Sequence, residues 1–361
     1  MPCHTIVHRQ DWFLEESYRA RTDREEPGFL DRSFELHFNE RPFLNHFSYL
    51  FITRTTKERM RQQSNFSVLC RGHILPREVR DKDGILRFLE AVEQFGRIIC
   101  DSGLVRLERL TTEEITGKGK EAGLVEKYFS LSQEDTTTLE DIRLGGAEMR
   151  VGDKRLSVHT LSDADDLPSA VRTDGRYEKY STDRSDCRLS FAAPVGLMLP
   201  YNHICNQYVF IDDPSETLRH FEKAARNMRS LSRYSRANEI NRQWTEEYLN
   251  EAHSFGLVPV RCHCNVMAWS EDRERLRNIR NDTGSALAQM GCKPRHNTVD
   301  APTLYWAGIP GGEGPSTRSS NRRPASSSGR RTMPPPSRPS ASRWRTGSAA
   351  GPSIWTSRTS R

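Results

Sequence analysis

The sequence predicts a mixed α/β (α+β) fold, in which helices cover a central mixed sheet. Residues 189–199 and 208–211 are two apolar runs joined by a short polar connection, and both are apolar at consecutive positions. Such runs are typical of strands that helices cover on both faces. A helical pattern over 213–256, a strand pattern over 258–269 and a helical pattern over 270–291 follow. This order indicates an open α/β or α+β domain.

Helices and strands alternate in the first hundred residues. Residues 25–41 predict a helix, because apolar side chains recur at helical spacing, and 47–53 predict a strand rich in aromatic and β-branched residues. Residues 83–100 predict a second helix, which Gly103 is positioned to end. The apolar positions are Phe29, Leu30, Phe34 and Phe38 in the first helix, and Ile85, Phe88, Leu89, Val92, Phe95, Ile98 and Ile99 in the second.

Shorter elements are expected between residues 105 and 176. Residues 105–110 and 155–161 predict short strands, and 112–131 predict a segment that is helical in its second half. The acidic, Thr-rich residues 132–148 and the polar residues 163–176 predict surface connections.

The helical region 213–256 carries its own start and break signals. Asp213 can cap the helix, Pro214 suits the first helical position, and Glu216 lies three residues after the cap. Residues 232–238 are polar and have weak helix propensity. We therefore expect a long helical arm, made of two helices or of one bent helix.

Charge divides the chain into a body and a tail. The formal net charge is +6, but residues 315–361 contain ten arginines and no lysine, aspartate or glutamate, so the first 314 residues carry a formal charge of −4. We predict a scaffold region over 1–314, either as one unit or as two lobes of about 1–150 and 151–314. The tail also holds thirteen serines and seven prolines. It cannot bury enough apolar surface to offset the entropy of ordering, so we predict that it is disordered.

The composition of the tail has a second interpretation. Arg, Ser, Pro, Thr and Trp together are what a GC-rich coding sequence yields when it is read in the wrong frame. From Ser319 onward, codons consistent with the tail can encode, one base back, an amphipathic helix followed by a strand-like end. We hypothesise that a single-base change near residues 312–315 shifted the frame and truncated the protein.

The cysteines and the apolar pattern bear on the compartment. The eight cysteines, at positions 3, 70, 100, 187, 205, 262, 264 and 292, are scattered without a CxxC pair. The sequence has no signal-peptide pattern, and no apolar run approaches the ~20 residues that span a bilayer. We expect a cytoplasmic location, reduced thiols and no transmembrane segment.

The chain lacks the sequence pattern of a nucleotide-hydrolysing motor. Such a motor needs a glycine-rich loop whose backbone N–H groups hold phosphates, written GxxxxGK[ST], and this pattern does not occur. The nearest text, Gly117-Lys-Gly-Lys-Glu-Ala-Gly123, has the wrong spacing and no hydroxyl residue after a lysine, which is typical of a surface turn. We predict that this chain is not an enzyme and has no catalytic residues and no cofactor.

Cys262, His263 and Cys264 are the best candidates for metal ligands, with His203 and Cys205 as further members. Zinc ligands are usually separated by two to four residues, so that both reach one ion. In a strand, Cys262 and Cys264 share one face and His263 points to the other. The pattern therefore favours small buried thiols, and no metal site is predicted.

Several other polar residues are weaker candidates for acid–base or nucleophilic chemistry. Nothing in the spacing joins the histidines, and residues 183–188 are more simply a charged turn with local ion pairs. The serines are expected to be turn residues, because no nucleophile elbow surrounds either. These candidates are His73, His159, His296, Asp183 with Asp186, Ser181 and Ser185.

Four stretches carry a resemblance to a known family. They are NERPFLNHFSYLFITRTTKER at 39–59, LCRGHILPREVRD at 69–81, STDRSDCRLSFAAPVGLMLPYNHICNQYVFIDD at 181–213 and KPRHNTVDAPTLYWAGIPG at 293–311. From about His4 to Gly311 the chain closely resembles the TraG-type conjugation ATPases of Bacteroides conjugative transposons, which are ATPases of type IV secretion machines. The resemblance covers the region that precedes the nucleotide-binding motor in that family.

The resemblance implies a motor-less N-terminal portion of a conjugal-transfer ATPase that acts as a scaffold. Full-length relatives use ATP and Mg²⁺. The implied partners are conjugation-channel components and like subunits of a ring, and the implied place is the cytoplasm or the cytoplasmic face of the inner membrane. The helices within 213–256 and 270–291 are the expected docking elements.

The alternative belongs to a different class: a cytosolic nucleic-acid-binding accessory protein that uses the basic tail. The arginines from Arg318 to Arg361 would attract phosphates without sequence preference. Trp344 and Trp355 would stack on bases.

Overall fold

The computed structural model describes residues 3–16, 28–39, 43–56, 81–103, 105–134, 140–143, 148–161, 166–168, 175–176, 182–184, 188–189, 192–196, 199–232, 234–312 and 353–357. His73, Ser181, Ser185, Asp186 and Trp344 lie outside these residues.

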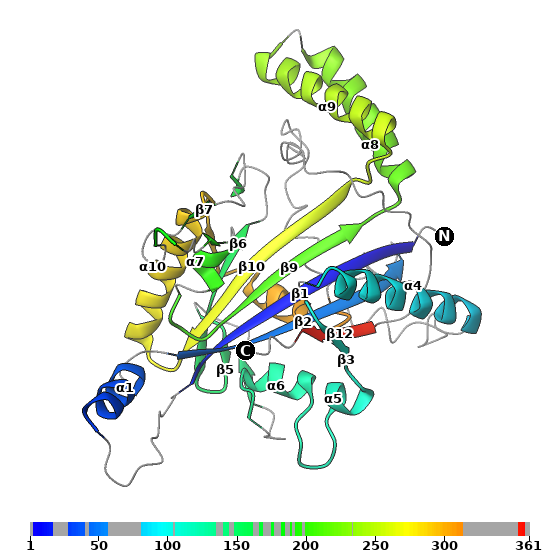
Figure 1. Ribbon diagram of the computed structural model, residues 1–361. Helices are drawn as coiled ribbons and strands as arrows, with labels where there is room; N and C mark the ends of the chain where they lie inside the picture. The colour runs from blue at the N-terminus through cyan, green and yellow to red at the C-terminus, as the bar shows by residue number, and fades with distance from the viewer. Residues whose placement is uncertain are drawn as a thin grey trace.

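One large sheet forms the centre of the protein (Figure 1). Its strands, in sheet order, are β3 (Leu107–Arg109), β12 (Ser353–Ser357), β2 (Phe43–Thr56), β1 (Cys3–Glu16), β9 (His203–Ile211), β10 (Val260–Ser270), β6 (Lys154–Leu161), β5 (Arg150–Val151) and β4 (Ile142–Arg143), with β11 (Arg295–Asn297) also paired to β6.

Every pairing between the described strands of this sheet is antiparallel. The mixed α+β class is confirmed, but the sheet that we expected to be mixed is antiparallel in its described part. The physical reason is visible between β9 and β10. Two antiparallel helices carry the chain out and back, so that Val260 begins β10 opposite Ile211 at the end of β9.

The main core lies on one face of the central strands. Trp12 of β1, Ile204 of β9 and Met267 of β10 are neighbours in the register and are almost fully buried. Helices α6 (Leu124–Ser130) and α11 (Ala301–Ala307) supply Tyr128 and Tyr305 to the same cluster. The Tyr128 hydroxyl donates to the Tyr305 carbonyl oxygen over 2.7 Å, which joins the two helices beneath the sheet.

The opposite face is covered by α10 (Arg273–Gln289) and α7 (Ala193–Gly196). Leu161 of β6 and Val266 of β10 pack there against Val195, Ala286 and Leu287. These helices cover the sheet around Cys205 and Val266, whereas within 208–211 Tyr208 and Phe210 are buried on the main-core face and Val209 and Ile211 are only partly buried on the other.

The strand expected at 189–199 is wrong within the described residues. Only β8 (Arg188–Leu189) is extended, and it pairs with β7 (Gly175–Arg176) in a separate two-stranded sheet. The chain then turns into α7, which contains Pro194. Proline has no N–H for a sheet ladder, and the N–H groups of Val195 and Gly196 bond the Ala192 carbonyl instead.

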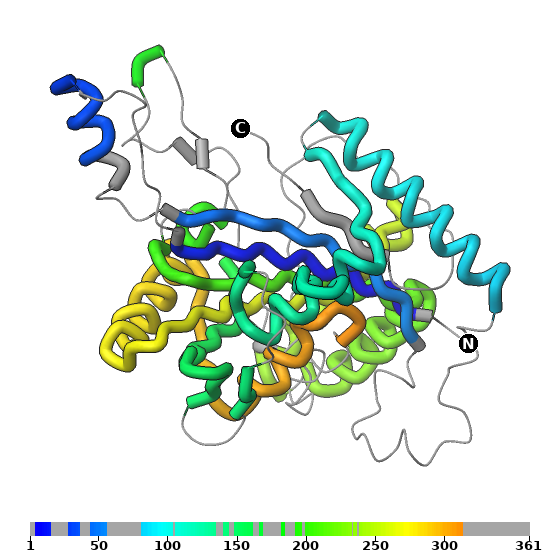
Figure 2. The backbone as a smooth tube through the Cα atoms, turned by 90° about the horizontal axis from the view of Figure 1, so that it is seen from below, coloured from blue at the N-terminus to red at the C-terminus, as the bar shows by residue number. Residues whose placement is uncertain are grey.

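The other predicted strands and helices of the first half are present. Residues 47–53 lie within β2, 105–110 contain β3, and 155–161 lie within β6. The segment 112–131 contains two short helices, α5 (Thr112–Thr116) and α6. The helix expected at 83–100 is α4 (Lys82–Asp101), whose Phe88 and Val92 pack against Ile52 of β2 (Figure 2).

Helix α1 (Phe29–Asn39) also forms, within the predicted span 25–41. However, the apolar side chains of α1 that the structure describes are exposed. Phe29 is 83% exposed and Leu30 is 79% exposed.

The predicted helical arm is confirmed as two helices, α8 (Pro214–Leu231) and α9 (Arg236–Phe255), with a break where the sequence predicts it. The arm projects beyond the ends of β9 and β10 (Figure 1). Asp213 caps α8 by accepting from the N–H groups of Ser215 and Glu216. The rings of Phe221 and Tyr248 meet edge to face across the arm, 5.5 Å between centroids.

Strands from both halves of the chain pair in the same sheet, and both halves contribute to the main core. The described residues thus form one unit across residue 150, and two lobes are not seen in them. In the tail, only residues 353–357 are described, as strand β12 between β2 and β3.

Candidate functional site

The turn 117–123, the nearest approach to a phosphate loop, is closed by its own hydrogen bonds. Lys118 and Glu121 exchange backbone hydrogen bonds of 3.0 and 3.1 Å. The N–H of Gly123, at the start of α6, donates to the Glu126 carboxylate over 2.9 Å. The Glu126 carboxylate thus already accepts from the Gly123 N–H, which a bound phosphate would need as a donor. The geometry fits the interpretation as a structural turn.

The cysteines of β10 lie as the strand pattern predicts. Cys262 and Cys264 share one face, and His263 is buried on the other. Cys264 lies with Cys205 and Cys292 in the apolar cluster beneath α10. Burial raises the pKa of all three thiols, that of Cys264 to about 12, so they remain protonated and unreactive. This environment supports the prediction of a buried thiol for Cys264, but Cys262 is exposed, so for Cys262 the prediction is wrong: the apolar cluster beneath α10 includes Cys264 and not Cys262.

Within the described ranges, no three His, Cys, Asp or Glu side chains gather closely enough to hold a metal ion. His203, the further metal candidate, bonds backbone instead: its two ring nitrogens lie 2.6 Å from the Tyr201 oxygen and 3.0 Å from the Val195 oxygen. Burial lowers the pKa of His203 to about 4, although the two carbonyls favour its protonated form. The burial effect is larger, so the ring is neutral and donates to one carbonyl at a time.

A row of buried polar side chains crosses the central strands on the main-core face. We call it the polar row; its members are His8 and Gln10 of β1, Asn206 of β9, and His263 and Asn265 of β10, all at most 3% exposed. Gln10, Asn206 and Asn265 are direct neighbours in the register, and so are the positions of His8, Tyr208 and His263. The row was not predicted, because its members are far apart in sequence.

The hydrogen bonds of the polar row form a continuous chain. The Asn206 side-chain oxygen accepts from Gln10 over 2.9 Å and faces His8 Nε2 at 3.0 Å. The Asn206 amide donates to Asn265 over 2.9 Å, and the Asn265 amide lies 3.3 Å from His263 Nε2. Gln10 also donates to the Gly308 carbonyl, which ties α11 to the sheet.

This series of hydrogen bonds determines which ring nitrogens of His8 and His263 carry protons. His8 must donate from Nε2, because its partner is an amide oxygen, whereas His263 accepts at Nε2 from an amide nitrogen and is protonated at Nδ1. Burial lowers the pKa of His263 to about 4, which keeps the ring neutral. A one-residue slip of any strand would leave several of these groups unpaired, so the row specifies the register of the sheet.

Two sequence candidates, His159 and His296, come together in the structure. They are opposite each other on β6 and β11, and their ring centroids are 5.3 Å apart. Their contact could not be predicted from spacing along the chain, because they lie on strands separated by more than a hundred residues. Asp183 is in an exposed turn, as predicted.

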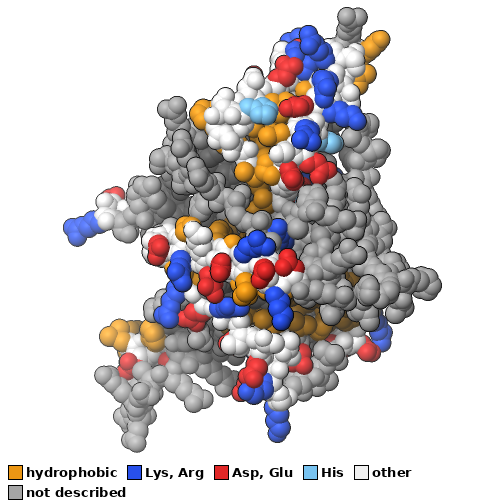
Figure 3. Space-filling view, turned by 90° about the vertical axis from the view of Figure 1, so that its right-hand side faces the viewer, with side chains coloured by type: hydrophobic (Ala, Val, Ile, Leu, Met, Phe, Trp, Pro, Cys, Tyr) orange, Lys and Arg blue, Asp and Glu red, His pale blue; other side chains and the backbone are white. Residues whose placement is uncertain are grey.

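The arm presents basic and apolar side chains together at its outer end. Figure 3 shows Lys and Arg side chains gathered there with hydrophobic ones. We call this surface the arm tip; its residues are Arg226, Arg229, Leu231, Tyr234 and Arg236, all exposed. Tyr234 is 84% exposed and Leu231 is 49% exposed.

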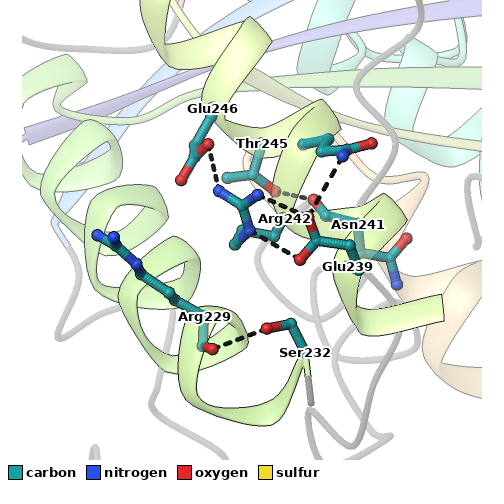
Figure 4. A network of polar contacts seen from close by, with 8 residues as sticks. Arg229, Ser232, Glu239, Asn241, Arg242, Thr245 and Glu246 are labelled. Carbon is teal, nitrogen blue, oxygen red and sulfur yellow. Dashed lines mark hydrogen bonds and ion pairs between the residues drawn. The ribbon is translucent and has the colours of Figure 1, made fainter. Parts of the chain in front are cut away.

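Ion pairs along α9 support the arm behind its tip (Figure 4). Arg242 lies 2.7 Å from the Glu239 carboxylate and 2.6 Å from that of Glu246, at helical spacings of three and four. These bonds raise the pKa of Arg242 and lower that of Glu239. Such solvent-exposed pairs contribute little to stability, so they orient the side chains more than they stabilise the fold.

A cavity of about 720 Å³ lies between β2 and helices α5 and α6. Four glutamates and two lysines line it, namely Glu108, Glu113, Glu114, Glu121, Lys118 and Lys127. Lys118 already pairs with Glu113 at 2.7 Å, and Glu114 caps α5 through Thr111. These side chains are used within the fold, and the net acidic lining does not suit a nucleotide phosphate.

No helix in the described ranges combines the length and the apolar character needed to cross a membrane. No protein-family profile matches the chain, and no curated protein matches it.

Proposed function

We propose that the chain is the motor-less N-terminal portion of a conjugal-transfer ATPase, and that it acts as a docking scaffold. The observation that carries this proposal is the set of four stretches that resemble the TraG-type conjugation ATPases. Three of them include elements of the central sheet and its covering layer: 39–59 includes β2, 181–213 includes β9, and 293–311 includes β11 and α11. The likeness is therefore distributed over the fold and not confined to one element.

Two features of the fold support a scaffold role. The polar row fixes the register of β1, β9 and β10, which makes the sheet a rigid base. The arm extends from this base and exposes its tip to solvent. A rigid base with a projecting, partly apolar tip suits docking on another protein, because little has to be ordered when the contact forms.

The proposed partner of the arm tip is a conjugation-channel component, with a neighbouring copy of the ATPase as the second class of partner that the resemblance implies. The proposed location is the cytoplasm, at the cytoplasmic face of the inner membrane, where the chain could contact such a channel. No residue within the proposed scaffold is assigned a catalytic role.

Co-purification with the channel proteins encoded beside this gene tests the proposal. We expect at least one of them to be retained by the wild-type chain and lost from the double variant Leu231→Ser, Tyr234→Ser. Phe255→Ser is the matched control, because Phe255 is 76% exposed at the other end of α9 and should not affect retention. Equal retention by the wild type and the tip variant, or none by the wild type, would contradict the proposal.

The nucleic-acid alternative predicts a different outcome. The wild-type chain would then bind DNA and retain no channel protein, and deletion of residues 315–361 would abolish the DNA binding. A chain whose only partner is DNA, bound through the tail, would replace the scaffold proposal with the accessory-protein one.

A further inference from the structure

The arm joins the sheet through two short connections. Residues 212–213 lead from the end of β9 into α8, and residues 256–259 lead from α9 back to the start of β10. We call these two connections the root of the arm. Among the described elements, the two helices of the arm pack extensively only on each other. The direction in which the arm projects from the sheet (Figure 1) therefore depends on its root.

Contacts between α8 and α9 make the arm a single piece. The Phe221 ring of α8 meets the Tyr248 ring of α9 edge to face. Glu222 of α8 lies 3.5 Å from His253 Nε2 of α9. Because the two helices support each other in this way, a change in the direction of the arm would take place at the root.

One carboxylate at the root joins three neighbouring strands. Arg261 of β10 donates to the Asp212 carboxylate twice, from Nε over 2.6 Å and from a terminal nitrogen over 3.0 Å. His4 of β1 lies 2.7 Å from the same carboxylate through Nδ1, which must donate because an ionised carboxylate only accepts. We call Asp212, Arg261 and His4 the root cluster.

The register of the sheet brings the root cluster together. Ile211, the last residue of β9, pairs with Thr5 of β1 on one side and with Val260 of β10 on the other. Asp212 is the next residue, so its side chain lies on the same face as those of His4 and Arg261, between the two flanking strands. A slip of one residue in any of the three strands would turn one of these side chains to the opposite face.

The root cluster is shielded from water. His4 is almost fully buried, and Asp212 and Arg261 are partly buried. Burial by itself would raise the pKa of Asp212, but the hydrogen bonds from His4 and Arg261 outweigh it and hold the pKa below its ordinary value. The Arg261 guanidinium also lies over the Phe210 ring, 5.3 Å from its centroid. A shielded, bidentate pair of this kind fixes geometry more strictly than an exposed ion pair does.

We propose that the root cluster is a conformational lock, which holds the arm in one direction relative to the sheet and lets it pivot at the root when the cluster opens. Asp212 belongs to the connection that leaves the sheet, and Arg261 follows the connection that returns to it. Their pairing therefore prevents the two connections from moving independently. A fixed arm would present its tip to a partner with little left to order, a consequence that rests on the proposed function.

Distance measurements between two spin labels test the lock in the full chain. The labels are attached through an encoded unnatural amino acid at Tyr234, on the arm tip, and at Arg277, on α10; both positions are exposed. We expect one narrow distribution of distances in the labelled chain without further change. The distribution should become broad in Arg261→Gln, because glutamine cannot form the bidentate, charged pair with Asp212.

Arg295→Gln is the matched control. Arg295 also donates two hydrogen bonds to a buried aspartate, Asp166, over 3.0 and 2.8 Å, but it lies on β11 and not at the root. The loss of this pair should leave the distribution narrow. A narrow distribution in Arg261→Gln would overturn the lock. A broad one in Arg295→Gln as well would also overturn it, because the spread would then follow from a general loss of stability.

Asp212→Asn separates the lock from folding. Asparagine keeps the volume of the side chain but carries no charge, so the pair with Arg261 is weakened while the strands keep their register. We expect a broad distribution of distances together with an unchanged circular dichroism spectrum, and a narrow distribution would contradict the role of Asp212. No partner protein enters these measurements, so a failure of the lock and a failure of the proposed docking are observed separately.

Discussion

Buried histidines determine how this protein responds to acid. His159, His203 and His263 each have a pKa lowered to about 4, with burial as the main cause, against an ordinary value of 6.5. A group whose pKa is lower in the folded state stabilises the fold above its unfolded pKa. This contribution is lost as the pH falls from 6.5 towards 4.

We therefore predict that the free energy of unfolding decreases between pH 6.5 and pH 4, by up to about 1.4 kcal/mol per pH unit for each buried histidine. Urea unfolding at half-unit pH steps measures the slope. His263→Gln should reduce this slope by up to about 1.4 kcal/mol per pH unit, which corresponds to the uptake of one proton. Asp11, Asp212, Glu114 and Glu148 have lowered pKa values and begin to add to the slope below about pH 5, so the histidine contribution is read between pH 6.5 and about pH 5. An identical slope in His263→Gln would contradict the assignment.

The polar row yields a second prediction at this scale. Asn206→Ala removes the partner of His8, Gln10 and Asn265 at once, leaving buried groups unsatisfied. We expect a loss of about 3 kcal/mol in the free energy of unfolding at pH 7, measured in urea. Gln207→Ala, the next residue of β9 on the opposite face, should cost less than about 1 kcal/mol. Equal losses of unfolding free energy in the two variants would mean that the polar row does not specify the register of the sheet.

At the scale of elements, local signals in the sequence predicted most helices correctly. Asp213 and Pro214 mark the start of the arm, and the polar segment 232–238 marks its break. The prediction of a strand at 189–199 was wrong because it relied on hydrophobicity alone. It did not take into account that Pro194 has no N–H for a sheet ladder. The contact of His159 on β6 with His296 on β11 could not be predicted, because it depends on the register of the folded sheet.

Two glycine variants test the element boundaries with opposite signs. Gly256 ends α9 at φ +62°, where a side chain is strained, so Gly256→Ala should lower the free energy of unfolding by about 1 kcal/mol. Gly284 is inside α10 with ordinary helical geometry, so Gly284→Ala should raise it by up to about 1 kcal/mol. Urea unfolding at pH 7 compares them. A destabilised Gly284→Ala or a neutral Gly256→Ala would contradict the assigned geometry.

At the scale of the whole molecule, the acidic body and the arginine-rich tail have different origins in our account. We propose that the body is a scaffold and that the tail follows from a shift of reading frame. We predict that the gene, read one base back after the codon for Glu313, encodes a continuation rich in aliphatic residues and, further on, a phosphate loop. Sequencing the gene past its stop codon checks this, and codons that cannot encode such a peptide would refute the frame change.

The most direct test of the central claim is titration of the purified chain with Mg·ATP, followed by an assay of phosphate release. A scaffold without a motor should hydrolyse no ATP and show no Mg²⁺-dependent affinity for it. Saturable, Mg²⁺-dependent binding of ATP, or any turnover, would show that a motor is present after all.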